Sequence, residues 1–124
     1  MRKMTLALAA VSMSVIGGAA FAEGDPGAGA KVFNKCKACH TIKEGGKHKV
    51  GPNLHNIVGR AAGVAEGYRY SKAMAKSGIT WDEATLIAFL EKPRKYVKGT
   101  KMSFAGLKKL ADRENVITYL KAPQ

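Results

Sequence analysis

The feature that most constrains this chain is a run of five residues, Cys36-Lys37-Ala38-Cys39-His40, which reads Cys-x-x-Cys-His. This spacing is typical of the covalent attachment of a c-type haem. Two thiols three residues apart on one helical turn can each bond to a vinyl group of the porphyrin, and the imidazole that follows can bind the iron. The other residues must then enclose the flat, apolar porphyrin and supply a second iron ligand on the side opposite His40.

Three other interpretations of Cys36 and Cys39 compete with haem attachment: a redox dithiol, half of a zinc site and a small-loop disulfide. A thioredoxin-like dithiol requires a βαβ context, which this sequence does not predict. A structural zinc site requires four ligands, and the chain has no second cysteine pair. We favour the haem interpretation, and a mass spectrum of covalently bound haem would exclude the dithiol.

Residues 1–22 are predicted to be a signal peptide that is removed after Ala22. Arg2 and Lys3 precede an uncharged run that ends in the small-x-small sequence Ala20-Phe21-Ala22. The alternative is a retained membrane anchor, because the uncharged run is nearly long enough to span a bilayer. Cleavage leaves residues 23–124 as one domain. Haem attachment in bacteria takes place outside the inner membrane, so we expect the protein in the periplasm.

The chain is strongly basic, with a formal charge of +12. Without Arg2 and Lys3, 19 basic and 9 acidic residues remain, a charge of +10. A nucleic-acid-binding protein would show a compact basic stripe with interleaved aromatic residues. The lysines here are spread along the chain, so we expect no nucleic acid. We expect acidic docking faces of redox proteins as partners, with transient contact to an anionic membrane surface. We expect a monomer.

A mature chain of this size cannot bury a large core by itself. The haem would therefore act as part of the core, and we expect the haem-free chain to fold poorly.

The first half of the mature chain predicts one helix and a long loop. Residues 23–35 should form a helix, with Asp25 as N-cap and Pro26 as its first residue. Residues 41–67 should be a glycine-rich loop, and a loop of this length is unusual unless it wraps something. A short helix should follow over 71–77.

The second half predicts two further main helices. Thr80-Trp81-Asp82-Glu83 reads as a capping box with Thr80 as N-cap, and Pro93 ends the helix that follows. Residues 93–97 should add a turn, and 99–106 a loop. The last helix should run from about Asp112 to Lys121, with Asp112 taking over the cap. No alternating run is long enough for a sheet. The fold class is all-α, with three main helices, short helices and loops.

The ligand opposite His40 is left open by the residues alone. Met102 lies in a loop between Gly99 and Gly106 and is free to approach the iron, although methionine is by default a flexible core residue. The candidates are His48, His55, Met74 and Met102.

Several runs of the sequence resemble class I cytochrome c, close to mitochondrial cytochrome c and to the cytochrome c2 of purple bacteria. They are residues 36–41, 45–55, 78–81 and 93–104, and together they cover almost the whole mature chain. The resemblance implies the small cytochrome c fold around one covalent haem c. It also implies that Met102 is the second iron ligand and that His/Met ligation raises the haem potential.

The resemblance implies further roles for individual residues. The Pro52 carbonyl should accept a hydrogen bond from His40. Gly29 and Phe33 should contact the last helix at Val116, Ile117 and Leu120, and Phe104 should lie beside the exposed haem edge. The haem propionates should be held by Arg60, Tyr70, Ser71, Trp81 and Thr100.

Two positions depart from the pattern of many relatives. Phe89 stands where a tyrosine hydroxyl bonds the methionine sulfur, and Met74 stands where an asparagine helps to bind a water and a propionate. Both changes predict a drier haem pocket.

The expected function is one-electron transfer rather than enzyme catalysis, because both axial positions would be filled. The family usually takes electrons from a cytochrome bc1 complex and delivers them to a terminal oxidase or a photosynthetic reaction centre; the sequence does not choose between these acceptors. The alternative is a haem peroxidase or a gas-binding haem protein with a labile sixth ligand. By resemblance, the docking residues are Lys35, Lys49, Arg94, Lys95, Lys101, Lys108 and Lys109.

Overall fold

The computed structural model describes residues 22–123, so residues 1–21 of the expected signal peptide lie outside the described part. Five helices are present there: α1 (Pro26–Phe33), α2 (Lys72–Ala75), α3 (Glu83–Glu91), α4 (Pro93–Tyr96) and α5 (Leu110–Lys121). Over the same residues there is no strand, only one bridge between Ala61 and Thr80. None of the described helices has the length and apolar character needed to cross a bilayer. The all-α prediction is confirmed.

Helix α1 begins as the sequence predicts. The Asp25 carboxylate accepts hydrogen bonds from the backbone N–H of Gly27 at 3.0 Å and of Ala28 at 3.3 Å, which satisfies two of the free donors at the helix start. Pro26 follows as the first helical residue, where its missing N–H is not needed. The helix ends at Phe33, two residues earlier than expected, and the chain turns into the cysteine motif.

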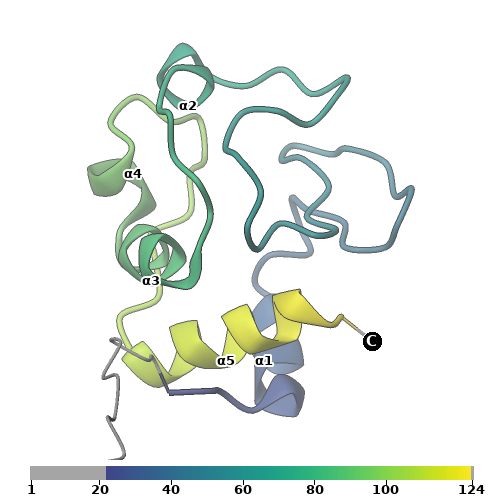
Figure 1. Cartoon of the computed structure of the whole chain (residues 1–124), viewed down its shortest axis with the longest axis vertical. Helices are drawn as coiled ribbons and strands as arrows, with labels where there is room; N and C mark the ends of the chain where they lie inside the picture. The colour runs from purple at the N-terminus through teal and green to yellow at the C-terminus, as the bar shows by residue number, and fades with distance from the viewer. Residues whose placement is uncertain (1–21, 124) are drawn as a thin grey trace, which may run out of the picture.

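Helices α1 and α5 cross and make the most extensive contact between elements in the structure (Figure 1). Gly29 is buried at this crossing, and a Cβ built on it would lie 2.8 Å from the Cβ of Tyr119. The Phe33 and Tyr119 rings lie 5.3 Å apart between centroids. The missing side chain at Gly29 therefore allows the two helices to approach closely.

Helix α3 begins later than predicted, because Asp82 and not Thr80 is its N-cap. The Asp82 carboxylate accepts from the backbone N–H of Thr85 at 2.8 Å and from its hydroxyl at 2.6 Å. Thr80 instead pairs with Ala61 in extended conformation, and the Trp81 N–H donates to the Arg60 carbonyl at 2.9 Å. These contacts with a distant loop keep the chain extended up to Asp82.

The Asp82 cap should make stability pH-dependent at acidic pH. The hydrogen bonds from Thr85 lower the pKa of Asp82 below its ordinary value of 3.8. The carboxylate therefore stabilises the fold fully above that value, and this contribution is lost as pH falls through the lowered pKa of the folded state. The variant Asp82→Asn keeps a side chain that can cap the helix but does not titrate. We expect the melting temperature of wild type to exceed that of Asp82→Asn at neutral pH and the difference to shrink on acidification; a pH-independent difference would contradict this.

Helix α5 also begins at a different residue from the one expected. It starts at Leu110, and neither Asp112 nor any other described side chain caps it; Asp112 lies within the first turn. The Arg113 guanidinium donates to the Ile87 carbonyl at 2.9 Å and to the Lys108 carbonyl at 3.4 Å. The buried Arg113 thus ties the start of α5 to α3 and to the residues just before α5.

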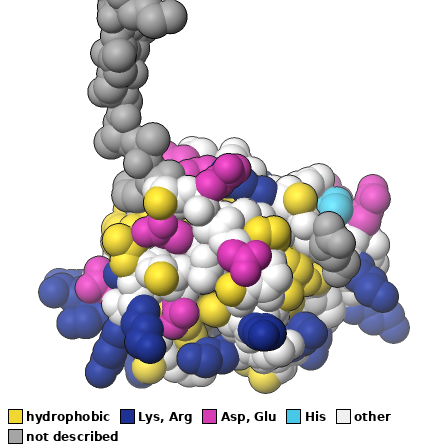
Figure 2. All heavy atoms as spheres, turned by 90° about the horizontal axis from the view of Figure 1, so that it is seen from below, with side chains coloured by type: hydrophobic (Ala, Val, Ile, Leu, Met, Phe, Trp, Pro, Cys, Tyr) yellow, Lys and Arg dark blue, Asp and Glu magenta, His cyan; other side chains and the backbone are white. Residues whose placement is uncertain are grey.

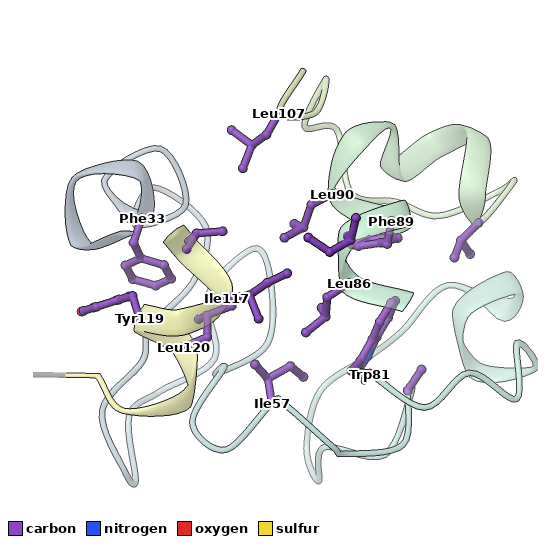
Figure 3. Close-up of a cluster of buried hydrophobic side chains, with 14 of the residues drawn as sticks. Phe33, Ile57, Trp81, Leu86, Phe89, Leu90, Leu107, Ile117, Tyr119 and Leu120 are labelled. Atoms are coloured by element: carbon purple, nitrogen blue, oxygen red, sulfur yellow. The ribbon is translucent and has the colours of Figure 1, made fainter. Parts of the chain in front are cut away.

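The core consists of two groups of side chains that face a common space (Figure 3). One group comes from α1 and α5, and the other from α3 and from Trp81, two residues before it. Ile57 of the long loop and Leu107 of the chain before α5 lie at the edges of this space. The labelled members of the two groups are Phe33, Ile117, Tyr119 and Leu120, and Trp81, Leu86, Phe89 and Leu90.

Candidate functional site

The space between the two groups is a cavity of about 420 Å³. It is walled by α1 and α5, by α3, by the loop over 50–71 and by the chain over 100–107. This volume is within the range of about 300–1,000 Å³ that is common for small-molecule and cofactor sites. Its apolar walls include Phe33, Leu54, Ile57, Leu86, Phe89, Leu90, Leu107, Val116 and Leu120.

The cysteine motif forms a tight turn directly after α1 and lines the cavity. The N–H groups of Cys39 and His40 both donate to the Cys36 carbonyl, at 3.1 and 2.9 Å. No disulfide joins the two cysteines. Burial, together with the nearby Cys39, raises the pKa of the Cys36 thiol, and Lys35 opposes the shift. The turn presents both sulfurs and the His40 ring to the same cavity.

The His40 ring is fixed from behind. Its Nδ1 donates to the Pro52 carbonyl at 2.7 Å, the contact that the family resemblance predicts, and this leaves Nε2 as the free nitrogen. Burial lowers the pKa of His40, Lys49 lowers it further, and the Pro52 carbonyl opposes the shift. A neutral imidazole with a bonded Nδ1 is the form that binds metals.

Gly51 packs its backbone against the His40 ring, so a side chain there should displace the ring. A Cβ on Gly51 would lie 2.7 Å from both ring nitrogens. We expect Gly51→Ala to lower the free energy of unfolding of the holoprotein by about 1–2 kcal/mol, as overpacking usually does, measured by urea denaturation.

The matched control is Gly45→Asn in the same loop. Gly45 has φ +70° and open space around its Cα, and asparagine tolerates this conformation. Equal stability of Gly51→Ala and Gly45→Asn would contradict the packing role of Gly51.

Of the four candidates for the second ligand, two line the cavity and two do not. Met74 and Met102 are lining residues, whereas His48 and His55 are not. Both His48 nitrogens bond to backbone: Nδ1 accepts from Asn53 N–H at 3.0 Å, and Nε2 donates to the Glu66 carbonyl at 2.7 Å. The Met102 N–H donates to the Thr100 hydroxyl at 3.3 Å, which holds this segment in its bend.

The residues expected to hold the propionates all line the cavity: Arg60, Tyr70, Ser71, Trp81 and Thr100. Arg60 donates to the carbonyls of His55 at 3.1 Å and Asn53 at 3.2 Å, and the Tyr70 hydroxyl accepts from Ala65 N–H at 3.1 Å. These bonds fix the positions of a guanidinium and a phenol at the polar part of the wall.

The two departures from the family pattern lie in the apolar wall. Met74 is 8% exposed and Phe89 is 6% exposed, and the Phe89 ring packs on Trp81 with centroids 4.7 Å apart. Neither side chain brings a hydroxyl or an amide to the cavity, and the drier pocket stays a prediction.

Asn53 organises the proximal loop and was not singled out from the sequence. Its amide nitrogen donates to the Thr41 hydroxyl and the Lys43 carbonyl, both at 2.8 Å, and its amide oxygen accepts from His55 N–H at 2.9 Å. The sequence feature that could have pointed to Asn53 is its position directly after Gly51-Pro52.

The cavity fits a haem in three independent respects. Paired thiols stand on one turn, an imidazole with its second nitrogen already bonded lies beside them, and a thioether lies on the same cavity. The walls are apolar, as a porphyrin requires. Arg60 and Tyr70 lie on the cavity wall, where they could bind the haem propionates.

Comparison with known proteins decides the family. The family model described as cytochrome c matches residues 27–123. The chain belongs to the cytochrome c family. The sequence-based resemblance is therefore confirmed, and so is the small all-α fold. The cofactor of this family is covalent haem c, which Cys36 and Cys39 attach here.

The relatives include bacterial members of the cytochrome c family. The chain is 51% identical over 117 residues to cytochrome c-554 of Methylosinus trichosporium, covering 94% of this chain and 88% of that protein. It is 55% identical over 97 residues to cytochrome c2 of Rhodoblastus acidophilus, covering 78% and 91%. The solved structure of cytochrome cH from Methylobacterium extorquens matches with a TM-score of 0.75 and 47% identity, covering 79% of this chain and 98% of that one. Members of this family are electron carriers and generally not enzymes.

Proposed function

We propose that this protein is a periplasmic one-electron carrier whose haem iron is held between His40 Nε2 and the Met102 sulfur. The observation that carries the proposal is that His40 and Met102 line one cavity, each in a segment fixed by its own hydrogen bond, to Pro52 and to Thr100. The haem supplies an iron that alternates between the ferric and ferrous states.

The protein residues have three tasks in this proposal. The Pro52 carbonyl orients the His40 ring and increases the basicity of its nitrogen. The apolar walls exclude water, and with a soft sulfur ligand they favour the ferrous state. Arg60 and Tyr70 meet the propionates, whose burial without partners would be unfavourable.

The charge distribution supports acidic partners. Residues 34–77 and 92–109, which supply the loop walls of the cavity, carry sixteen basic and two acidic residues. On the face seen in Figure 2, Lys and Arg gather along the lower and lateral edges, and most acidic side chains lie higher. The seven docking residues expected from the resemblance are all exposed. We propose a bc1-type donor and a terminal oxidase or reaction centre as acceptor, with attraction that weakens as salt rises.

The ferric far-red sulfur-to-iron charge-transfer band tests the ligand assignment. Wild type should show the band, and Met102→Ala should lose it. The midpoint potential should also fall, by on the order of 100 mV, because axial ligands tune haem potentials over about 0.8 V. Met74→Leu, on the same cavity, is the control and should keep the band. A band that survives in Met102→Ala but not in Met74→Leu would refute the assignment.

A further inference from the structure

The first described residues are fixed to the last helix. Residues 22–25, here called the N-terminal strap, run beside α5 before the chain enters α1 (Figure 1). The Gly24 N–H donates to the Thr118 hydroxyl at 2.9 Å, and the Asp25 N–H donates to the Asn115 side-chain oxygen at 2.9 Å. Two consecutive backbone donors of the strap are therefore held by side chains of α5.

The strap also packs directly on the backbone of α5. A Cβ built on Gly24 would lie 2.5 Å from the Asn115 Cα and 2.5 Å from the Glu114 carbonyl oxygen. Both are backbone atoms of a helix, which cannot turn aside, so glycine allows an approach that any side chain would prevent. Ala22 and Glu23 continue this contact, because together with residues of α3 and α5 they line a small cavity of about 10 Å³.

The predicted removal of the signal peptide falls within the strap. Water adds across the peptide bond between Ala22 and Glu23, which leaves a carboxylate on Ala22 and an ammonium group on Glu23. A partner that binds an extended peptide commonly does so through main-chain hydrogen bonds. The side chains of Ala22 and Glu23 are exposed, but the N–H groups of Gly24 and Asp25 are already bonded to α5. The docked strap therefore withholds its backbone from a peptidase.

We propose that docking of the strap on α5 protects the bond between Ala22 and Glu23, so that the signal peptide must be removed before α1 and α5 come together. Because we expect the haem to complete the core between α1, α5 and α3, removal also precedes completion of the haem-bound fold. The inference concerns maturation rather than electron transfer, and it rests on the predicted cleavage after Ala22. The cleavage rate of the folded chain then follows the fraction of molecules in which the strap is open.

Cleavage of the full-length chain by purified signal peptidase in detergent tests this order. The haem-loaded precursor is collected from cells in which the peptidase is inhibited, and the haem-free precursor carries Cys36→Ala/Cys39→Ala. Mass spectrometry follows the appearance of the chain that begins at Glu23. We expect the haem-loaded precursor to be cleaved at least roughly thirtyfold more slowly, which corresponds to two hydrogen bonds of about 1 kcal/mol each.

Gly24→Ala separates the effect of the strap from that of the whole fold. The added Cβ should lift the strap from α5 without changing any residue of the helix, so the haem-loaded variant should be cleaved roughly tenfold faster than haem-loaded wild type. In the haem-free chain the same substitution should leave the cleavage rate unchanged, because the strap is not docked there. Thr118→Val removes one of the two acceptors and should give a smaller increase, roughly fivefold.

Ser77→Ala is the matched control. It removes a side-chain oxygen that accepts from the Ile79 N–H, just after α2 and at the end of the molecule away from α5 (Figure 1). Haem-loaded Ser77→Ala should be cleaved as slowly as wild type. Equal rates for the haem-loaded and haem-free precursors, or a haem-loaded Gly24→Ala that stays as slow as wild type, would overturn the proposal. A haem-free precursor that is not cut after Ala22 would instead refute the predicted cleavage site itself.

Discussion

Without haem, the chain should show no cooperative thermal unfolding transition. The cavity of about 420 Å³ separates the side chains of α1 and α5 from those of α3, so the core is not continuous without the cofactor. An empty apolar cavity destabilises a protein by about 24 cal/mol per Å³. For this cavity the penalty is about 10 kcal/mol, comparable with the whole stability of a typical domain, about 5–15 kcal/mol.

The comparison uses the Cys36→Ala/Cys39→Ala double variant, which cannot bond haem covalently, and the holoprotein. Circular dichroism on heating should give a sharp transition for the holoprotein and a broad or absent one for the haem-free chain. Cys36→Ala alone is the matched control, because one thioether bond can still retain the haem. A sharp transition in the haem-free chain, at a temperature near that of the holoprotein, would show that the haem is not part of the core.

Gly29→Ala should destabilise the protein by about 3 kcal/mol, the upper end of what overpacking usually does. Its Cβ would lie 2.7 Å from the carbonyl carbon of Asn115 and 2.8 Å from the Cβ of Tyr119. The first of these is a backbone atom of α5, which cannot turn aside as a flexible side chain can. The two helices must then move apart, and the packing of Phe33 on Tyr119 is weakened. Urea denaturation of the holoprotein measures the loss.

Gly27→Ala, two residues earlier in α1, is the control for helix propensity. Its Cβ would meet nothing closer than an Asp25 oxygen at 3.5 Å. Because alanine is a better helix former than glycine by about 1 kcal/mol, Gly27→Ala should be neutral or stabilising. Equal effects of the two substitutions would indicate that Gly29 matters only for local helix formation.

Local signals in the sequence predicted local structure well. The start of α1 is marked by two neighbouring residues, Asp25 and Pro26, and both act as expected. The N-cap of α3 was predicted at the wrong residue because two capping patterns overlap in the sequence. One pairs Thr80 with Glu83, and the other pairs Asp82 with Thr85. Pairing of Thr80 with Ala61 decides between them, and this long-range contact is not visible in the sequence. The early start of α5 similarly depends on the contact of Arg113 with Ile87.

The site was predictable to the extent that it depends on motifs. Residues 36–40 indicate haem attachment by their spacing alone, whereas the choice of Met102 over His48 required the family resemblance. The structure adds a reason that the sequence could not supply, since both His48 nitrogens are occupied by backbone groups. Gly24 and Thr118, which join the N-terminal strap to α5, are 94 positions apart, and no periodicity or motif connects them.

The crossing of α1 with α5 has a consequence for biosynthesis. One wall of the haem cavity is formed by α1 and α5, the first and the last helix of the described chain. It is therefore incomplete until the whole segment through α5 is present and the haem lies between α1, α5 and α3. Until then the thiols of Cys36 and Cys39 stay accessible on an unfolded polypeptide, the condition under which a ligation enzyme can reach them.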